Sequence, residues 1–280
     1  FNTVMGHKAG QYMTGSNNTY LGFEAGKGSQ TSAPYSSATD NVAVGQYALT
    51  AVTTGGANVA IGGRALYRNN IGSNSVGVGW GAGYNTTGSY NTFVGKDAGY
   101  GGTTSAPFSS GQYNTAVGYL ALTAFTTAIH NVAFGSDSMR TNTSGNYNTA
   151  YGSSAMRTNT TGGANVALGY AAARDLDGGN YNVVVGNGAG YNLGGSSNNI
   201  LIGDEAGYAI NNSGANGTVA IGHEAGKALI SGAGNTAIGY EALLTEDTGG
   251  GNTAIGYQAL KLNNKDSSTA GNTVIGYQAA

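Results

Sequence analysis

A short sequence unit recurs sixteen times from one end of this 280-residue chain to the other. Two clear copies read Asn-Thr-Ala-Ile-Gly-Tyr-Glu-Ala at 235–242 and Asn-Thr-Ala-Ile-Gly-Tyr-Gln-Ala at 252–259, which makes the period seventeen. Most successive copies keep this spacing, and the others lie between sixteen and twenty-three positions apart. A turn this small cannot bury its own core and has to stack on its neighbours. The repeat therefore predicts a single all-β solenoid domain over residues 1–280, with about 16 turns.

One glycine in each copy, called the anchor glycine below, never varies within the chain. A position restricted to glycine needs positive φ or a close backbone approach, so we predict a sharp bend there, as at Gly62 and Gly239. Asn stands four residues earlier in fourteen of the sixteen copies, as at Asn58 and Asn235. Stacked Asn side chains can hydrogen-bond along a solenoid, so this row predicts a structural ladder. The anchor glycines are Gly6, Gly22, Gly45, Gly62, Gly79, Gly95, Gly118, Gly135, Gly152, Gly169, Gly186, Gly203, Gly222, Gly239, Gly256 and Gly276.

A short strand is predicted in the three residues before each anchor glycine. Its first residue is Thr, Val or Ile and its third is a large apolar residue, such as Ile61 or Ile238. These two positions share one face, and we expect them in the core. The residue between them is usually Ala, so we expect the small-residue face to pack against another copy of the chain. A second short strand is expected after the Ala that follows three residues beyond the bend.

Composition excludes several classes of protein. The formal net charge is −2 with no basic run, which argues against a nucleic-acid partner. No apolar stretch of about 18 residues exists, so no membrane insertion is expected in this segment. Without cysteine there are no disulfides or thiolate chemistry. The chain begins at Phe1 without a signal peptide, which suggests a mature or excised segment. Each turn buries little apolar surface, and the stabilisation from this burial is small compared with the conformational entropy lost when the turn becomes ordered. We therefore expect the chain to self-associate and so bury more apolar surface.

The unit Asn-Thr-Ala-Ile-Gly-x-x-Ala resembles the head repeat of the trimeric autotransporter adhesins, the YadA-like family. Related repeats occur in phage tail fibres and in bacterial surface fibre proteins. The resemblance covers residues 2–280 and rests on matches such as Val59, Ile61, Gly62, Ile238 and Gly239. It implies a left-handed parallel β-roll in which three identical chains pack side by side as a homotrimer. The turn here is longer than is usual in the family, and no stalk, neck or anchor is present.

A longer repeat points to candidate contact loops. Two blocks of equal length, from Gly6 to Gly79 and from Gly79 to Gly152, share the same order of spacings. Each carries one long loop, and the two loops match at 31–37 and 104–110. Insertions in solenoids often lie on the binding face. The loops are therefore candidates for receptor contact or for locking a trimer, unless the block was duplicated without a selected role. The candidate residues are Pro34, Tyr35, Pro107 and Phe108.

Tyrosines recur at two further positions of the turn. Such rows either stack on one another within the fold or offer aromatic surface to a glycan. We favour the structural interpretation. One row contains Tyr84, Tyr100, Tyr191 and Tyr208, and the other contains Tyr90, Tyr113, Tyr147 and Tyr181.

No strong metal motif is present. Glu205, Glu224 and Glu241 share one position in consecutive turns and would repel one another without a counter-charge. A weak cation site is one explanation, and a solvated face or pairing between chains with Lys227 is the favoured one. The Gly-Gly-x-Gly-x-Asp calcium pattern is absent. No metal or other cofactor is predicted.

These observations favour a protein that is not an enzyme, because catalysis needs convergent carboxylates or bases that the repeat does not supply. We expect an extracellular fibre or adhesin head, at a cell surface or on a virion, that attaches to a surface glycan or protein receptor through repeated outer loops. A phage tail fibre and a structural surface filament are the alternatives. An ice-binding solenoid is a minor one, suggested by Thr141, Thr143, Thr158 and Thr160 in adjacent turns.

Overall fold

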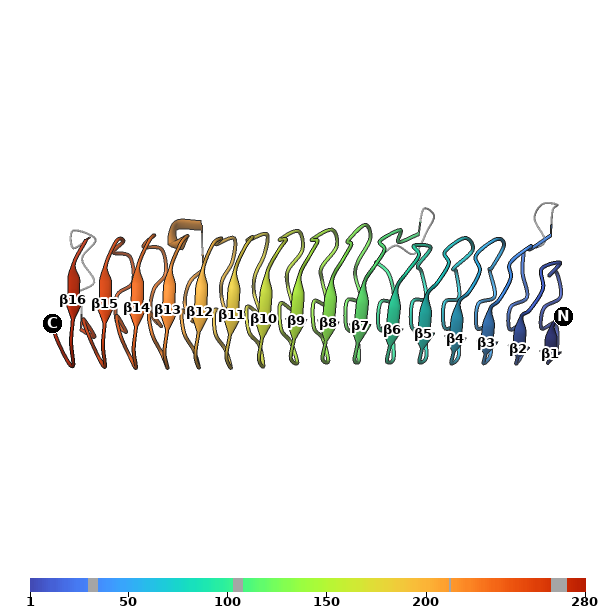
Figure 1. Ribbon diagram of the computed structural model, residues 1–280, viewed down its shortest axis with the longest axis horizontal. Coiled ribbons are helices and arrows are strands. Elements are labelled where there is room, and N and C mark those ends of the chain that lie inside the picture. The colour runs from blue at the N-terminus through green and yellow to red at the C-terminus, as the bar shows by residue number, and fades with distance from the viewer. Residues whose placement is uncertain (30–34, 103–107, 212, 263–270) are drawn as a thin grey trace. The chain divides into compact units, whose positions relative to one another are not determined.

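The computed structural model describes residues 1–29, 35–102, 108–211, 213–262 and 271–280. The chain divides into two units, Phe1–Ser144 and Gly145–Ala280. Within each unit, strands that follow one another in sequence pair in parallel, so the prediction of an all-β parallel solenoid is confirmed. Figure 1 shows the strands of each unit side by side, with loops at one edge and the bends after the strands at the other. These are called the loop edge and the bend edge below.

Each unit contains eight three-residue strands among its described residues. The first unit holds β1 (Thr3–Met5), β2 (Thr19–Leu21), β3 (Val42–Val44), β4 (Val59–Ile61), β5 (Val76–Val78), β6 (Thr92–Val94), β7 (Thr115–Val117) and β8 (Val132–Phe134). The second holds β9 (Thr149–Tyr151), β10 (Val166–Leu168), β11 (Val183–Val185), β12 (Ile200–Ile202), β13 (Val219–Ile221), β14 (Thr236–Ile238), β15 (Thr253–Ile255) and β16 (Thr273–Ile275). A 3₁₀ turn, η1 (Ser213–Ala215), precedes β13.

The anchor glycines form the predicted bends. All sixteen have positive φ, between 125° and 143°. A Cβ atom added at Gly62 would lie 2.7 Å from the carbonyl carbon and oxygen of Gly79 in the next turn. Positive φ and this close approach of backbone together exclude any other residue. The invariance of the position is therefore a backbone requirement.

The predicted facing of the strands is wrong. The middle residue points into the interior, where Ala60 and Ala237 are fully buried, and its two neighbours point outward. Ile61 is 41% exposed, although its place in the pattern predicts it in the core. The interior is narrow because the segment after the bend also enters it, with Ala65 and Leu66 fully buried there. A methyl group fits in the remaining space, whereas the larger side chains face outward.

Two interior positions compensate for each other in size. Where the middle strand residue is large, the residue four positions after the anchor glycine is glycine in every copy but the last. A Cβ atom at Gly26 would lie 2.3 Å from the ring of Tyr20, and one at Gly99 would lie 2.1 Å from the ring of Phe93. Where the middle residue is Ala, as at Ala60, the later position usually holds Leu or Met. Most turns thus fill the cross-section in one of two ways.

The second strand expected after the bend does not form in the described residues. Residues 63–68, for example, form a turn. Arg64 and Leu66 have φ of 58° and 48°, which is left-handed backbone and incompatible with an extended strand. The segment is still hydrogen-bonded from turn to turn, since Leu66 N donates to Ala82 O at 2.8 Å. Stacking, rather than extended geometry, satisfies its backbone.

The Asn row forms a hydrogen-bonded ladder, as the sequence predicts. In the second unit, the backbone N–H of Asn165 donates to Oδ1 of Asn148 at 3.1 Å, and that of Asn182 donates to Oδ1 of Asn165 at 2.9 Å. The side-chain amide of Asn165 also donates to Gly179 O at 2.8 Å. These amides are buried and satisfy backbone groups that no strand partner reaches.

Candidate functional site

The outer sheet face, formed by the first and third residues of every strand, is largely apolar, with threonine at half of the first positions, and is partly exposed to solvent. In the second unit Leu168 is 46% exposed, Ile202 36% and Ile275 67%, with Val166 and Ile200 exposed beside them. Parallel sheets in proteins are almost always covered on both faces. A contiguous exposed apolar patch marks an interaction surface. This face is the largest candidate for contact with another chain.

The four tyrosines of the first predicted row lie in two separate stacks. Tyr84 and Tyr100 in the first unit have ring centroids 4.8 Å apart and planes 2° apart. Tyr191 and Tyr208 in the second are 5.0 Å and 18° apart. Stacked rings cover one another's faces, so little more than edges and hydroxyl groups remains for a partner. This geometry favours the structural interpretation over sugar stacking.

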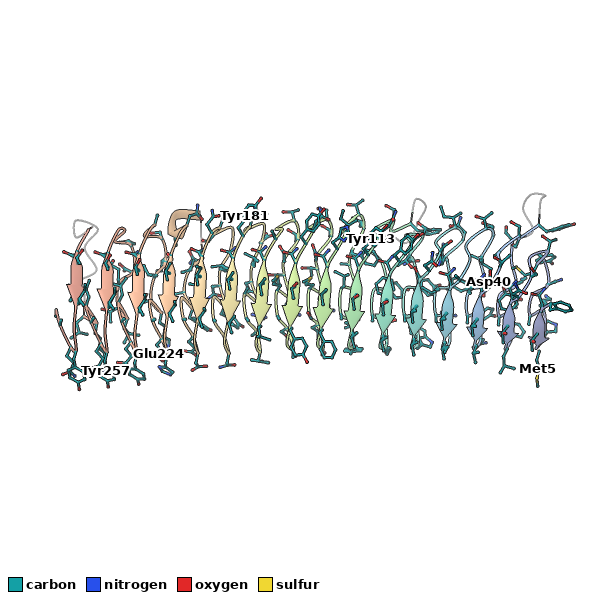
Figure 2. The ribbon with its side chains drawn as sticks, viewed as in Figure 1. Met5, Asp40, Tyr113, Tyr181, Glu224 and Tyr257 are labelled. Carbon is teal, nitrogen blue, oxygen red and sulfur yellow. The ribbon has the colours of Figure 1, made fainter. Side chains whose placement is uncertain are left out.

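The second predicted row lies at the loop edge, where Figure 2 shows Tyr113 and Tyr181. Tyr113 stacks on Tyr90 at 5.0 Å and on His130 at 4.8 Å. Tyr147 and Tyr181 are two turns apart and are 61% and 67% exposed. The row is therefore continuous in the first unit and broken in the second.

The glutamate row lies at the bend edge of the second unit, where Figure 2 shows Glu224. Lys227 bridges Glu205 at 2.5 Å and Glu224 at 2.7 Å, and Lys261 pairs with Glu241 at 2.5 Å. The hydrogen bonds that Lys227 donates to Glu205 and Glu224 raise its pKa, and the hydrogen bond from Lys261 lowers the pKa of Glu241. Lysines of the same chain thus supply the counter-charge that the sequence requires.

An aromatic row beside these carboxylates was missed in the sequence. His223, Tyr240, Tyr257 and Tyr277 follow their anchor glycines directly and stack at 5.0, 5.2 and 5.1 Å. Figure 2 shows Tyr257 at this edge. Residues at this position vary along the whole chain, which hid the run of three tyrosines in the last three copies.

The corresponding edge of the first unit carries alternating cations and aromatic rings. The Arg64 guanidinium lies 5.9 Å from the ring centroids of both Tyr47 and Trp80. The Lys96 ammonium lies 5.8 Å from Trp80 and 5.7 Å from Tyr119. Such contacts are electrostatic attractions between a cation and the ring face.

A groove of about 750 Å³ crosses the first unit. It arises from the residues six positions after the anchor glycines of four consecutive turns: Tyr12, Gly28, Ala51 and Arg68. The two small residues form the floor between two bulky end walls, and Phe108 also lines the groove. Its volume is within the range of about 300–1,000 Å³ that is common for ligand sites. Aligning the repeat at this position would have revealed it.

Arg68 is the charged group of this groove without a charged partner. Its guanidinium lies 4.8 Å from the ring centroid of Phe108 and 6.0 Å from that of Tyr67. Within the described residues it forms no ion pair, and its buried Nε has no hydrogen-bond partner. The buried Oδ1 of Asn70, also in the lining, has none either. Both atoms are covered by protein, so a ligand would approach the guanidinium at its terminal Nη groups.

The described ends of the two matched loops border this region. Tyr35 is 53% exposed and stacks on Tyr12 at 6.5 Å, whereas Phe108 packs on Arg68. Pro34 and Pro107 lie outside the described residues. The loop ends are held alike in both blocks, since Ser36 and Ser109, which occupy the same place in the two blocks, each donate a hydroxyl hydrogen bond to a carbonyl of the next turn.

In the part of the chain that the structure describes, no group of three or more His, Cys, Asp or Glu side chains is placed to hold a metal ion. No helix there is long and apolar enough to cross a membrane.

Compared with known proteins, the sequence matches no family model and has no significant match among curated proteins. The assignment of a function therefore depends on the surfaces described above.

Proposed function

We propose that the chain is a segment of an extracellular fibre, an adhesin head on a cell surface or virion, and that it is not an enzyme. In this proposal several copies associate side by side through the outer sheet face, and the loop edge attaches the fibre to a surface. The resemblance to YadA-like heads supplies two finer parts of the proposal, the left-handed roll and the number of three chains.

The exposed outer sheet face is the observation that carries this proposal. A lone chain leaves side chains such as Leu168 and Ile202 in water along a parallel sheet, which is rare in proteins. Covering them in an assembly would recover about 25 cal/mol for each Å² of apolar surface buried. The contact surface thus consists of large side chains, and not of the alanines that the sequence suggested.

A side-by-side assembly would also multiply the loop edge. Each copy would present its own groove and its own Tyr35 and Phe108. Linked copies of a weak site bind a multivalent surface far more tightly than one copy does. This suits attachment, and it applies equally to a bacterial adhesin and to a phage tail fibre. A purely structural filament would need the sheet face but not the groove.

Ice binding is supported least. The threonines that suggested it lie in turns and not on a flat strand face. The Thr158 hydroxyl donates to Arg174 O at 3.2 Å, and Thr160 hydrogen-bonds to Asp177. These hydroxyls therefore serve the stacking of the turns.

Light scattering on the purified 27.9 kDa chain tests the assembly. We expect a mass three times that of the chain. Leu168→Lys should give monomers with unchanged circular dichroism, because the outward side chain is replaced without disturbing the interior. Tyr181→Lys, an exposed change at the loop edge, is the matched control and should remain assembled. A monomeric parent chain at all concentrations would refute the side-by-side association.

A further inference from the structure

We propose that the groove of the first unit binds a carboxylate-bearing saccharide and that Arg68 pairs with its carboxylate. This inference rests on the proposed attachment function, for which it names the ligand class. The chemistry is shared by uronic acids and sialic acids, and the experiment below separates the two.

The shape of the groove fits a short, compact ligand. Its floor at Gly28 and Ala51 spans the two turns between the end walls at Tyr12 and Arg68. Successive turns are about 4.8 Å apart, so the walls are separated by roughly 14 Å. Among the described residues no strand lies at the floor, since Ala51 is in a turn and Gly28 in irregular backbone, so a peptide has no strand edge there on which to add a β-strand.

The charge of the groove selects an anion. Lys27 lines it, but its ammonium is held by Glu24 at 3.0 Å. Arg68 has no such partner in the described residues and is surrounded by aromatic rings. A guanidinium is weakly hydrated and binds a carboxylate through two parallel hydrogen bonds. Arg68 therefore keeps its charge, and its terminal Nη groups rather than the buried Nε are the donors for a planar anion.

The remaining lining is suited to a sugar. Thr50, Thr53 and Thr54 place hydroxyl groups along the groove. The Thr53 hydroxyl already donates to Asn70 O at 2.8 Å, so its oxygen remains as an acceptor. Sugar hydroxyls would donate to the threonine oxygens. Phe108 supplies apolar surface for the carbon skeleton of a pyranose ring.

Titration calorimetry with matched probes tests the proposal on the full chain. The probes are tetragalacturonate and 3′-sialyllactose, each compared with its methyl ester, so that the two members of a pair differ only in the charge of the carboxyl group. We expect at least one acidic probe to bind and its neutral counterpart to bind at least tenfold more weakly. Arg68→Gln should weaken the acidic probe about ten- to hundredfold, as expected for the loss of charge-assisted hydrogen bonds. Added salt should weaken it too.

Two further variants separate a local site from general charge. Arg64→Gln removes one positive charge from the same turn but outside the groove, and should leave the affinity unchanged. Ala51→Phe fills the floor while keeping Arg68, and should abolish binding. Circular dichroism and light scattering show whether each variant folds and assembles as the parent does.

Three results would overturn the inference. They are no binding of either acidic probe, equal binding of acidic and neutral probes, and equal losses in Arg68→Gln and Arg64→Gln. A fourth result would also overturn it. If hexaglutamate, an acidic peptide without sugar, bound as tightly as the acidic saccharides, the groove would recognise charge and not sugar. Any of these results in an assembled protein would leave the proposed fibre standing. A monomeric protein that still binds the probes would refute the assembly and keep the groove.

Discussion

The interiors of the two units are built on the same plan, whereas the side chains at their edges differ. Unit 1, residues 1–144, has six basic and four acidic residues and a formal net charge of +2. Unit 2, residues 145–280, has five basic and nine acidic residues and a net charge of −4. Both have the same anchor-glycine bends, an Asn-rich ladder and buried middle strand residues.

The bend edges of the two units avoid repulsion between like charges in successive turns in two different ways. Equal residues in successive turns lie about 5 Å apart, so like charges repel. Unit 1 alternates cations with rings, as in Arg64, Trp80 and Lys96. Unit 2 stacks like residues and bridges its carboxylates through Lys227 and Lys261. A repeat thus fixes the spacing of surface side chains, while their chemistry remains free to diverge.

The largest expected effect tests the shared interior. Ala60→Lys in unit 1 and Ala167→Lys in unit 2 both bury an unpaired charge, and each should cost more than about 4 kcal/mol. The neighbouring outward changes Ile61→Lys and Leu168→Lys should retain the fold. Thermal unfolding followed by circular dichroism compares the stability of the inward and the outward variant in each unit. A chain with either alanine changed that melted like the parent would show that the strand facing is misassigned.

A middle-sized effect should separate the two ladders. The Asn165 side chain takes part in four hydrogen bonds with neighbouring turns, whereas that of Asn58 takes part in two. Ser75 in place of the next Asn accounts for one of the two missing bonds, and the other is the bond to the preceding Asn. Asn165→Ala should therefore destabilise by about 3 kcal/mol and Asn58→Ala by about 2 kcal/mol, counting unsatisfied buried groups. Chemical unfolding curves measure the difference.

Asn58→Ser is the control for this comparison, since serine is the residue that unit 1 itself uses at Ser75. It should cost less than Asn58→Ala because a hydroxyl can still accept from the next backbone N–H. Equal losses for Asn58→Ala and Asn165→Ala would mean that side-chain bonds between Asn residues add nothing to the ladder.

The smallest effect concerns pH. In unit 2 the hydrogen bond with Lys261 lowers the pKa of Glu241. The ionised Glu241 therefore stabilises the fold at pH values above the pKa that this carboxyl group has in the unfolded chain. This stabilisation is lost as the pH falls through the lower pKa that the group has in the folded chain. In unit 1 burial raises the pKa of Asp97, so acid removes an unfavourable charge there. Acidification below about pH 4 should loosen the bend edge of unit 2 and not that of unit 1.

Hydrogen exchange, corrected for the intrinsic pH dependence, measures this at 204–261 and at 47–119. Lys261→Met removes the partner of Glu241 and should abolish the acid sensitivity of its surroundings while leaving the rest of unit 2 unchanged. The same response to acid in both segments would contradict the contrast between the edges.

Much of the fold could be predicted because every copy of the repeat has to satisfy the same structural requirements. The period determined the stacked turns, the invariance of Gly62 and its equivalents determined the bend, and the Asn row determined a ladder. Each of these depends on contacts between equal positions of successive turns. Such contacts can be read from alignment of the copies alone.

The candidate surfaces could be predicted only in part. Tyr35 and Phe108 were found through the duplicated block, but Arg68 and Asn70 were not, because the groove forms where four turns differ. Its walls and floor come from Tyr12, Gly28, Ala51 and Arg68 side by side. Such a depression depends on sizes compared across turns, and not on any motif within one turn.

The facing of the strands was decided by the tertiary structure. A period of two places Val59 and Ile61 on one face, but it does not say which face is inside. The answer depends on how much of the interior the rest of the turn fills. The side chain of Leu66 enters the interior from the segment after the bend, where the residue has a left-handed φ that local sequence preference does not predict. The sequence by itself determined the spacing and the stack, and packing against that segment put the alanines inside and left the large side chains on the surface.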